Sequence, residues 1–478
     1  MHKNSSYSDG KKSHILIPRK TLVIIAAISL LWCIWAGQGA FIHQTLDNLW
    51  RNATFHDLIK KPWPVIYKDN SMLCYYIAHW MAPAAVGKAV YLISGSVYAG
   101  YFAGNIALLI YTSFGCFLTL LLTAVITQRK KNAHFIVAAV VFIFFSGLDT
   151  AGKWFIPVSF LGNNIEWWGS YFQFSSVSTC LFWAYNQSVA AWLATICILN
   201  ERSTKNYALL GMLALPFAPF PFIGLVAICL IKAVFMGKRE IGRKRFGKFL
   251  KNTASLQNIL VFTAVGIPYA LYYSANSIVA GNAYYNGVKL KTGLRLHDEL
   301  TYAFAKGNTK HILDFIVIYL VFFMMEAGVL LLLIKLGKKK KKVTAEFIVY
   351  TVVLAIIPLI QMGKDYDFSM RVSIPFIIYI AMEFIRTFTA KIPKRGTIKR
   401  LEDIVLKTPW FTAAVIAFII GAVTPATEYI RQLALTFSVG PPDYFICESM
   451  EDFDEINNFS AQGYEESYFG RLIMKRHD

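Results

Sequence analysis

The sequence contains little charge for its length, and acidic residues are especially scarce. Only 16% of its 478 residues are charged and 28 are Asp or Glu, whereas 56% are hydrophobic. Apolar runs of about twenty residues recur between short charged loops, which excludes an ordinary soluble protein and predicts a polytopic membrane protein. None of the segments between these runs is long enough for a conventional soluble domain.

Motifs for metal or nucleotide chemistry are also missing. The seven cysteines include no CxxC pair, and most lie within apolar runs, where a thiol acts as a small hydrophobic group. Thiolate metal sites are therefore not expected. Nor does the chain contain a P-loop, HExxH or GxSxG motif, or a GxGxxG in a suitable context, so these common motifs assign no function.

The net charge of +20 comes from basic blocks placed beside the apolar runs. Examples are "QRKKN", "GKREIGRKRFGKFLKN" and "GKKKKKV". Such blocks mark cytoplasmic loops under the positive-inside rule, although they could also contact anionic lipid headgroups. Because aromatic residues are not interleaved with them, nucleic acid is not an expected partner.

The charge rule predicts an all-α membrane protein of about eleven transmembrane helices. A cytoplasmic tail (1–20) precedes the membrane domain (21–428), and an extracytoplasmic tail (429–478) follows it. The expected spans are 20–38, 99–127, 133–148, 176–200, a proline-tipped hairpin of two within 207–235, 254–274, 311–336, 345–362, 373–389 and 409–428. Loop one (39–98) lies outside, and we expect its helices to lie along the membrane surface. If residues 75–95 crossed the membrane instead, everything downstream would be inverted.

Most acidic residues fall on the outer side of this arrangement. Asp47 and Asp57 belong to a predicted amphipathic helix of loop one, whose polar side also carries Arg51 and His56. Asp149 ends the third span. A carboxylate in such a place can accept a proton from a hydroxyl nucleophile. A solvated helix face or a turn is the alternative interpretation.

Two further outer segments contain candidate binding residues. One is the aromatic loop with Glu166, Trp167 and Trp168, which is typical of a membrane interface and would also suit a lipid or sugar site. The other is "GKDYDFSMRVSIP" at 363–375.

We expect a helix to begin near Ser373 in this second segment. Its free N–H groups and Arg371 would then bind phosphate. Asp365 and Asp367 would orient Arg371 or contact a sugar or metal; a local ion pair without a ligand is the alternative.

The sequence resembles the GT-C-type membrane glycosyltransferases in four features. These are an acid soon after the first span, helices in loop one, a second acid after the third span, and the span count. Several segments also resemble a group of poorly described bacterial polytopic proteins: "NATFHDLIKKPWPVIY", "FFSGLD", "FQFSSVSTCLFWAYNQSVAAWL", "DYDFSMRVSIP" and "SYFGRLIMK".

The GT-C resemblance implies an inverting sugar transfer at the outer face of the cell membrane. The donor would be a polyprenyl-phosphate-linked sugar among the membrane lipids, and the acceptor a glycan or lipid of the cell surface. Asp47 would be the base, with Asp57 as second candidate, and Arg371 would hold the phosphate. Loop one lacks an adjacent Asp-Glu or Glu-x-Asp pair, so a divalent metal (Mg or Mn) is left open as a cofactor.

Two other classes stay open on the sequence. A lipid-linked glycan flippase, exporter or polymerase would place charges near the membrane midplane, where the candidates are Asp314, Glu326 and Glu383. A non-catalytic scaffold subunit would instead use the acidic tail segment "ESMEDFDEINN".

Overall fold

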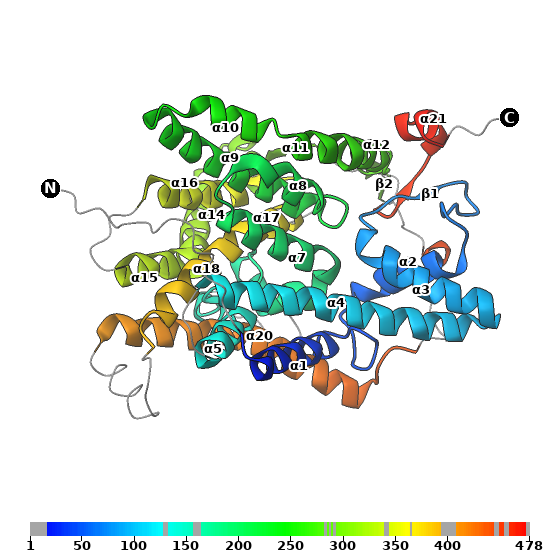
Figure 1. Cartoon of the computed structure of the whole chain (residues 1–478), viewed down its shortest axis with the longest axis horizontal. Coiled ribbons are helices and arrows are strands. Elements are labelled where there is room, and N and C mark those ends of the chain that lie inside the picture. Colours follow the sequence, from blue (N-terminus) through cyan, green and yellow to red (C-terminus); the bar gives the residue numbers. More distant parts are fainter. Residues whose placement is uncertain are drawn as a thin grey trace.

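The computed structural model describes residues 17–127, 132–155, 164–281, 284–285, 288–289, 293–338, 344–363, 366–392, 408–443, 449–453 and 458–474. It is about 74% helical with almost no sheet. The long helices lie roughly side by side in one bundle, and the helices of loop one gather at one end of it (Figure 1).

Six helices among the described residues are long and apolar enough to cross a membrane. They are α4 (Val97–Thr127), α7 (Val177–Asn200), α9 (Pro219–Gly242), the run from α10 to α12 (Phe246–Ser274), the run from α14 to α15 (Thr309–Gly337) and α20 (Pro409–Ser438). Shorter apolar helices are α1 (Arg19–Trp35), α5 (Asn132–Ile143), α16 (Ala345–Ile356) and α18 (Ile374–Thr389). The protein is thus an all-α membrane protein, whereas the count of eleven spans stays a prediction.

Short elements connect the long helices. The helical ones are α2 (Asn48–Lys60), α3 (Ala78–Ser94), α6 (Asp149–Gly152), η1 (Ile165–Gly169), α8 (Tyr207–Met212), α13 (Asp298–Ala305), α17 (Asp367–Val372), η6 (Met450–Asp452) and α21 (Tyr468–Leu472). The three two-stranded sheets pair β1 (Met72–Leu73) with β6 (Ser460–Ala461), β2 (Tyr284–Tyr285) with β3 (Val288–Lys289), and β4 (Arg295–Leu296) with β5 (Ile360–Gln361).

One end of the bundle, here called the basic end, joins the C-terminal ends of α7, α15 and α18. Arg386 of α18 donates to Asn200 at the end of α7 (3.2 Å) and pairs with Glu383 (2.6 Å). Lys338, directly after α15, pairs with the same glutamate at 2.6 Å. The C-terminal ends of three helices therefore lie at one level, as the charge-based threading predicts.

The opposite end, the loop-one end, joins the C-terminal end of α1 to the N-terminal end of α7. The indole of Trp32 donates to Ser178 Oγ at 3.0 Å, and Ser178 donates to the carbonyl of Ile143 at 2.7 Å. The late part of α20 is also here, because Trp35 donates to the Tyr429 carbonyl (3.0 Å). These contacts make α1 antiparallel to α7, in the predicted order.

The proline-tipped turn predicted within 207–235 is present, but its two arms are unequal. Its first helix, α8, has only six residues, too few for a span, and Pro219 begins the long second helix α9. Thr204 and Thr253 share a hydrogen bond of 2.7 Å. The residues before the first arm and those after the basic block therefore lie together.

The solvated polar face predicted for the first helix of loop one is wrong, because polar and apolar residues of α2 are buried alike. Leu46 and Leu49 are 63% and 52% exposed, whereas Arg51, His56 and Asp57 are buried. The assumption that water surrounds the helix causes the error, since polar residues of a membrane protein face the protein interior.

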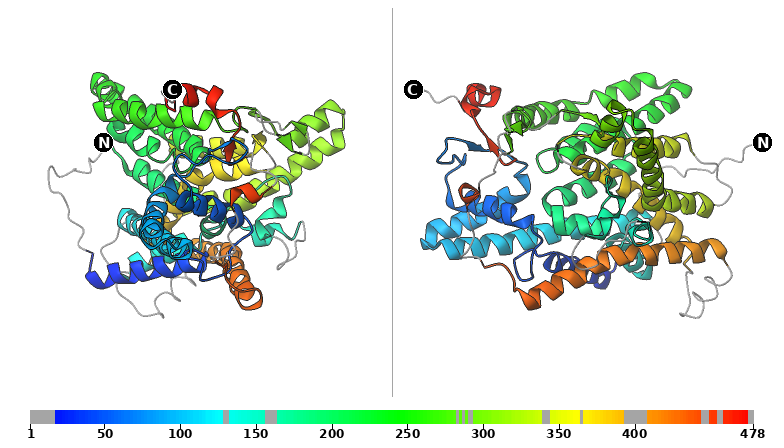
Figure 2. Two further views of the ribbon diagram at one scale, coloured as in Figure 1. Left: turned by 90° about the vertical axis from the view of Figure 1, so that its right-hand side faces the viewer. Right: turned by 180° about the vertical axis from the view of Figure 1, so that it is seen from behind.

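The second helix of loop one, α3, neither crosses the bundle nor lies flat along its surface. It runs back along the first half of α4, and a Cβ on Gly87 would lie 2.7 Å from the carbonyl oxygen of Gly100. His79 near its start bonds Thr112 of α4 at 3.0 Å. The two helices form a hairpin whose tip extends beyond the bundle (Figures 1 and 2).

This arrangement predicts opposite reactivity for two exposed positions. In a cysteine-free background, Ser94→Cys at the hairpin tip and Arg243→Cys in the basic block should react with a membrane-impermeant maleimide from opposite sides of the membrane, because they lie at opposite ends of the bundle. Labelling of intact cells against inside-out vesicles measures this. Reaction of both cysteines from one side would contradict the arrangement.

Candidate functional site

The first turn of α2 places a carboxylate beside a buried guanidinium group. Asp47 is the residue before α2 and Arg51 follows one turn later, so that Arg51 Nη2 donates to Asp47 Oδ2 at 3.1 Å. The Arg51 side chain is 4% exposed, whereas that of Asp47 is 39% exposed. The guanidinium group of Arg51 is therefore enclosed by protein, whereas the carboxylate of Asp47 is accessible from outside.

A second buried arginine comes from a distant part of the chain. Arg371 of α17 pairs with Asp367 one turn earlier, with 3.2 Å between Nη1 and Oδ2. Burial lowers the pKa of Arg371, but the charges of Asp367 and Asp47 outweigh it and raise the pKa above its ordinary value. Asp47 interacts electrostatically with Arg371, after Asp367, Tyr76 and Tyr75 in strength. We therefore group the two arginines in one region.

Two adjacent tyrosines lie beside both arginines. The ring centroids of Tyr75 and Tyr76 are 3.5 Å apart and their hydroxyl groups bond to each other. Both hydroxyl groups interact electrostatically with Arg51 and Arg371. We define the two-arginine site by Asp47, Arg51, Arg371, Asp367 and these tyrosines.

A break in α7 lies next to this site. Ala184 has non-helical backbone angles (φ −148°, ψ 40°) inside the helix. The carbonyl of Phe182 instead accepts hydrogen bonds from Thr45 (3.2 Å) and Asn48 (3.4 Å). Gln187, after the break, donates to the Tyr76 hydroxyl at 3.3 Å. Broken membrane helices often mark binding sites, because their free backbone groups line a cavity.

Several buried polar atoms of this region have no hydrogen-bond partner among the described residues. They are Arg51 Nε and Nη1, Arg371 Nε, Gln187 Oε1 and Asn48 Oδ1. A buried donor without a partner costs about 1–3 kcal/mol, more when it is charged. Three guanidinium N–H groups without acceptors suit a ligand with several anionic oxygens, such as a phosphate.

The helix predicted to begin near Ser373 is present as α18, with Pro375 in its first turn, but it follows α17 directly and its N-terminus is not open to an anion. The amide of Ser373 donates to Ser369 (3.1 Å), and its hydroxyl donates to Met370 (2.9 Å). Helical structure begins at Asp367, so Arg371 lies within α17. An anion here would be bound by side chains rather than by free backbone N–H groups. Asp365 lies outside the described residues.

Asp57, the second candidate base, binds the C-terminal segment instead. Its two oxygens accept hydrogen bonds from Ser449 Oγ (2.8 Å) and the Met450 amide (3.0 Å). Burial raises the pKa of Asp57, and these bonds oppose the shift. Because both oxygens are bound, we do not place Asp57 at the two-arginine site.

His56 is a buried neutral ring. It stacks on Tyr101 with centroids 3.9 Å apart, and its Nε2 lies 3.3 Å from the Asn105 amide nitrogen. Burial lowers the pKa of His56 to about 3, so the imidazole is uncharged at neutral pH. Its role is to pack α2 against α4.

Asp149 belongs to a separate acidic cluster together with Glu166 and Glu326. Asp149 is fully buried and accepts hydrogen bonds from Ser146 (2.8 Å) and Thr424 (2.9 Å). The charge of Asp149 acts on both glutamates. The hydrogen bonds found for Asp149 in the described structure do not include one to a residue of the two-arginine site.

The glutamates of this acidic cluster are held by the aromatic loop. Glu166 accepts from the Ser176 amide (2.7 Å) and from Gln173 (2.9 Å). Trp168 is buried and donates to Glu326 Oε1 at 2.8 Å. Trp167 is 40% exposed at the surface. The predicted residues of this loop therefore divide between the acidic cluster and the surface.

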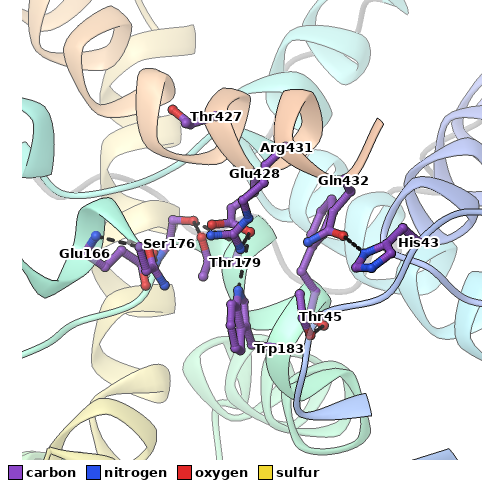
Figure 3. A network of polar contacts seen from close by, with 12 residues as sticks. His43, Thr45, Glu166, Ser176, Thr179, Trp183, Thr427, Glu428, Arg431 and Gln432 are labelled. Carbon is purple, nitrogen blue, oxygen red and sulfur yellow. Dashed lines mark hydrogen bonds and ion pairs between the residues drawn. The ribbon is translucent and has the colours of Figure 1, made fainter. Parts of the chain in front are cut away.

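A third group of polar side chains joins α20 to α7 (Figure 3). Trp183 Nε1 donates to Glu428 Oε2 at 3.3 Å, and Arg431 bonds the same carboxylate and lies 5.4 Å over the Trp183 ring. His43 Nδ1 lies 3.0 Å from Gln432 Oε1. Because this ion pair is self-contained, we assign it a structural role. Sequence reasoning missed it, although the Glu-x-x-Arg spacing on one helix was a signal.

Metal binding finds no support in the side-chain geometry. No group of three or more His, Cys, Asp or Glu among the described residues could hold a metal ion. Asp47 is instead paired with a cation, which makes it a poor metal ligand. We therefore assign no step to Mg²⁺ or Mn²⁺.

No protein-family model, curated protein or solved structure matches this chain. The site must therefore be interpreted from its own geometry.

The acidic cluster predicts a pH-dependent stability. Burial and the charge of Asp149 raise the pKa of Glu166 from 4.5 to about 8. Between these values the folded state binds more protons than the unfolded state, so the free energy of unfolding should fall as the pH rises through this range and level off above it. Glu166→Gln should flatten this decline. Thermal unfolding in detergent at several pH values measures it.

The matched control is Glu465→Gln, since Glu465 is an exposed acid outside the cluster. This control should keep the wild-type pH dependence. Equal slopes for Glu166→Gln and the wild type would show that Glu166 is already ionised in the folded protein.

Proposed function

We propose that the protein is a membrane glycosyltransferase that uses a polyprenyl-phosphate-linked sugar. One observation supports the proposal most strongly: a half-exposed carboxylate, Asp47, lies beside two buried arginines with unpartnered N–H groups. Such a site combines a proton acceptor with a phosphate receptor. The resemblance to GT-C-type glycosyltransferases points the same way.

The proposed reaction divides the roles among three residues. Arg51 and Arg371 bind the phosphate of the donor and stabilise the negative charge that develops as it leaves. Asp47 accepts the proton of the acceptor hydroxyl. The acceptor oxygen forms a bond to the anomeric carbon while the bond from that carbon to the phosphate oxygen breaks, with inversion. The proton ends on Asp47 and the electron pair on the phosphate.

The ion pair between Asp47 and Arg51 suits this order of events. In the structure Asp47 accepts one hydrogen bond from Arg51. A phosphate that reaches Arg51 competes for its N–H groups and weakens that bond. Donor binding would thereby release the base for the acceptor. Tyr75 and Tyr76 supply aromatic surface and hydroxyl groups beside the same arginines.

Substitutions at this site should lower the rate of transfer without unfolding the protein. Asp47→Asn should lower the rate by about 10²- to 10⁴-fold, as expected for loss of a general base. Arg371→Lys should lower it by about tenfold or more, because lysine lacks the planar fork of guanidinium donors. Incorporation of labelled sugar from polyprenyl-phosphate donors into membrane acceptors measures both effects.

Two exposed residues provide matched controls. Asp314→Asn, in the first part of α14, and Arg471→Lys, in α21, remove or alter the same groups at exposed positions outside the two-arginine site. Both should transfer sugar at the wild-type rate. Wild-type activity in Asp47→Asn and Arg371→Lys would disprove the proposed mechanism.

A second candidate function, a lipid-linked glycan flippase or exporter, is favoured by the acidic cluster. Glu326 lies in the π-helical turn η4 (Met324–Gly328) of a membrane helix, with Asp149 and Glu166 nearby. Buried carboxyl groups in a membrane often relay protons during transport. Glu326→Gln should then stop movement of lipid-linked sugar in proteoliposomes while Asp47→Asn permits it. The reverse pattern would reject transport.

A further inference from the structure

An open pocket lies at the loop-one end, between the C-terminal end of α2 and the second half of α3. Its volume is about 500 Å³, and it is lined by Lys60, Pro62, Trp63, Lys88, Tyr91 and Leu92. Four of these residues are apolar or aromatic and the other two are lysines. Ligand pockets of proteins have this size and this mixture of apolar walls with a few charged groups. We call it the lysine pocket; its lining includes no residue of the two-arginine site.

The positive charge of the lysine pocket is not balanced by a carboxylate. Lys61, next to the pocket, pairs with Glu451 at 2.8 Å. By contrast, the ion pairs found in the described part of the chain include neither Lys60 nor Lys88. A concave surface lined by charges of one sign attracts ligands of the opposite sign. The pocket therefore favours an anionic ligand.

Contacts with the end of α2 hold Lys88 and Trp63 in place. The Trp63 indole donates to the Leu58 carbonyl at 2.7 Å, and Lys88 Nζ donates to the Lys61 carbonyl. Both acceptors belong to the end of a helix, where carbonyl groups lack partners within the helix. Lys88 Nζ also lies 5.3 Å from the centroid of the Trp63 ring, which is within the range of a cation–π interaction. An ammonium group has three donors, so the fixed Lys88 retains donors for a ligand.

The lysine pocket lies at the level expected for lipid headgroups. Gly87, the neighbour of Lys88, packs closely on α4: a Cβ there would lie 2.7 Å from the Gly100 carbonyl oxygen and 3.1 Å from Gly104 Cα. These two glycines precede Thr127, the last residue of α4, by 27 and 23 residues, or about 40 and 35 Å along the helix. The hydrocarbon core of a membrane is about 30 Å thick, and about 40–45 Å with both headgroup layers. Since the basic block after Thr127 marks one surface of the membrane, Lys88 lies among the headgroups of the other.

Apolar side chains around this level favour a lipid over a soluble anion. Leu92 of the pocket is 73% exposed, and Val86 on α3 is 49% exposed. On α4, Ile110 and Phe114 are 61% and 58% exposed and lie farther from the hairpin tip than the pocket does. Exposed apolar surface of this kind marks contact with lipid, and a tryptophan such as Trp63 is typical of the headgroup level. A soluble phosphate would use the lysines and leave the apolar wall without a role.

We propose that the lysine pocket binds the headgroup of an anionic phospholipid from the membrane leaflet at the loop-one end. The phosphate lies between the ammonium groups of Lys60 and Lys88, and the acyl chains leave the pocket into the surrounding lipid. Because Lys60 ends α2 and Lys88 belongs to α3, the bound lipid joins the two helices of loop one. The inference concerns binding alone and holds whatever reaction the protein catalyses.

Protection of the two lysines from acetylation tests the site. The full chain is reconstituted in nanodiscs of phosphatidylcholine, with or without phosphatidylglycerol, and treated with acetic anhydride. Peptide mass spectrometry follows each lysine. Phosphatidylglycerol should slow acetylation of Lys60 and Lys88 by about fivefold, the factor expected for one contact of each lysine with an anionic headgroup. Lys68, whose side chain is 89% exposed outside the pocket, should react at nearly the same rate in both nanodiscs.

Reciprocal substitutions provide an independent arm. Lys88→Gln should remove the protection of Lys60, and Lys60→Gln that of Lys88, because a phosphate that loses one ammonium partner binds more weakly. Lys306→Gln, at an exposed position outside the pocket, should leave both protections unchanged.

Two outcomes would overturn the proposal. One is equal acetylation of Lys60 and Lys88 with and without phosphatidylglycerol. The other is equal protection by inorganic phosphate added to phosphatidylcholine nanodiscs, which would show a site for a soluble anion. Because no sugar transfer is measured, neither outcome affects the proposed function.

Discussion

Two guanidinium groups buried at one end of a membrane bundle impose the strongest constraint on this structure. An arginine cannot lose its charge by releasing a proton, so its surroundings must supply anions or hydrogen-bond acceptors. Here Asp47 and Asp367 each supply one carboxylate from one turn earlier on the same helix. Three of the remaining N–H groups lack acceptors among the described residues. The site is thus satisfied in charge but not in hydrogen bonds, which is the state expected of a receptor for an oxyanion.

The constraint explains the local structures around the arginines. Helix α2 is buried along most of its length, which brings Arg51 into the interior, whereas Leu46 and Leu49 near its start are exposed. The break of α7 at Ala184 lets Thr45 and Asn48 bond the Phe182 carbonyl, which fixes the start of α2 against the bundle. The hydroxyl groups of Tyr75 and Tyr76 bond to each other, and Gln187, after the break, donates to Tyr76. An unusual local structure of this kind costs stability, and here these features lie around the two arginines.

The sequence predicted the relative level of the helix ends better than the details of the site. Basic blocks are local signals, and they correctly grouped the C-terminal ends of α7, α15 and α18. Asp47, Arg51 and Arg371 were named from the sequence, but their proximity depends on how α2 and α17 meet. The buried face of α2 was mispredicted because periodicity does not reveal whether the surroundings are water, lipid or protein. The contact between Trp168 and Glu326 joins segments 158 residues apart, and no local pattern reveals it.

The two groups of charges also explain why Asp47 rather than Asp149 suits the role of a base. Asp149 is fully buried with two hydroxyl donors on one oxygen, so it is closed to an incoming hydroxyl group. Asp47 is open to an incoming hydroxyl and adjoins the arginines. A base must reach the acceptor hydroxyl group, and Asp47 meets this condition; the acidic cluster instead holds the π-helical turn of α14–α15 against α6.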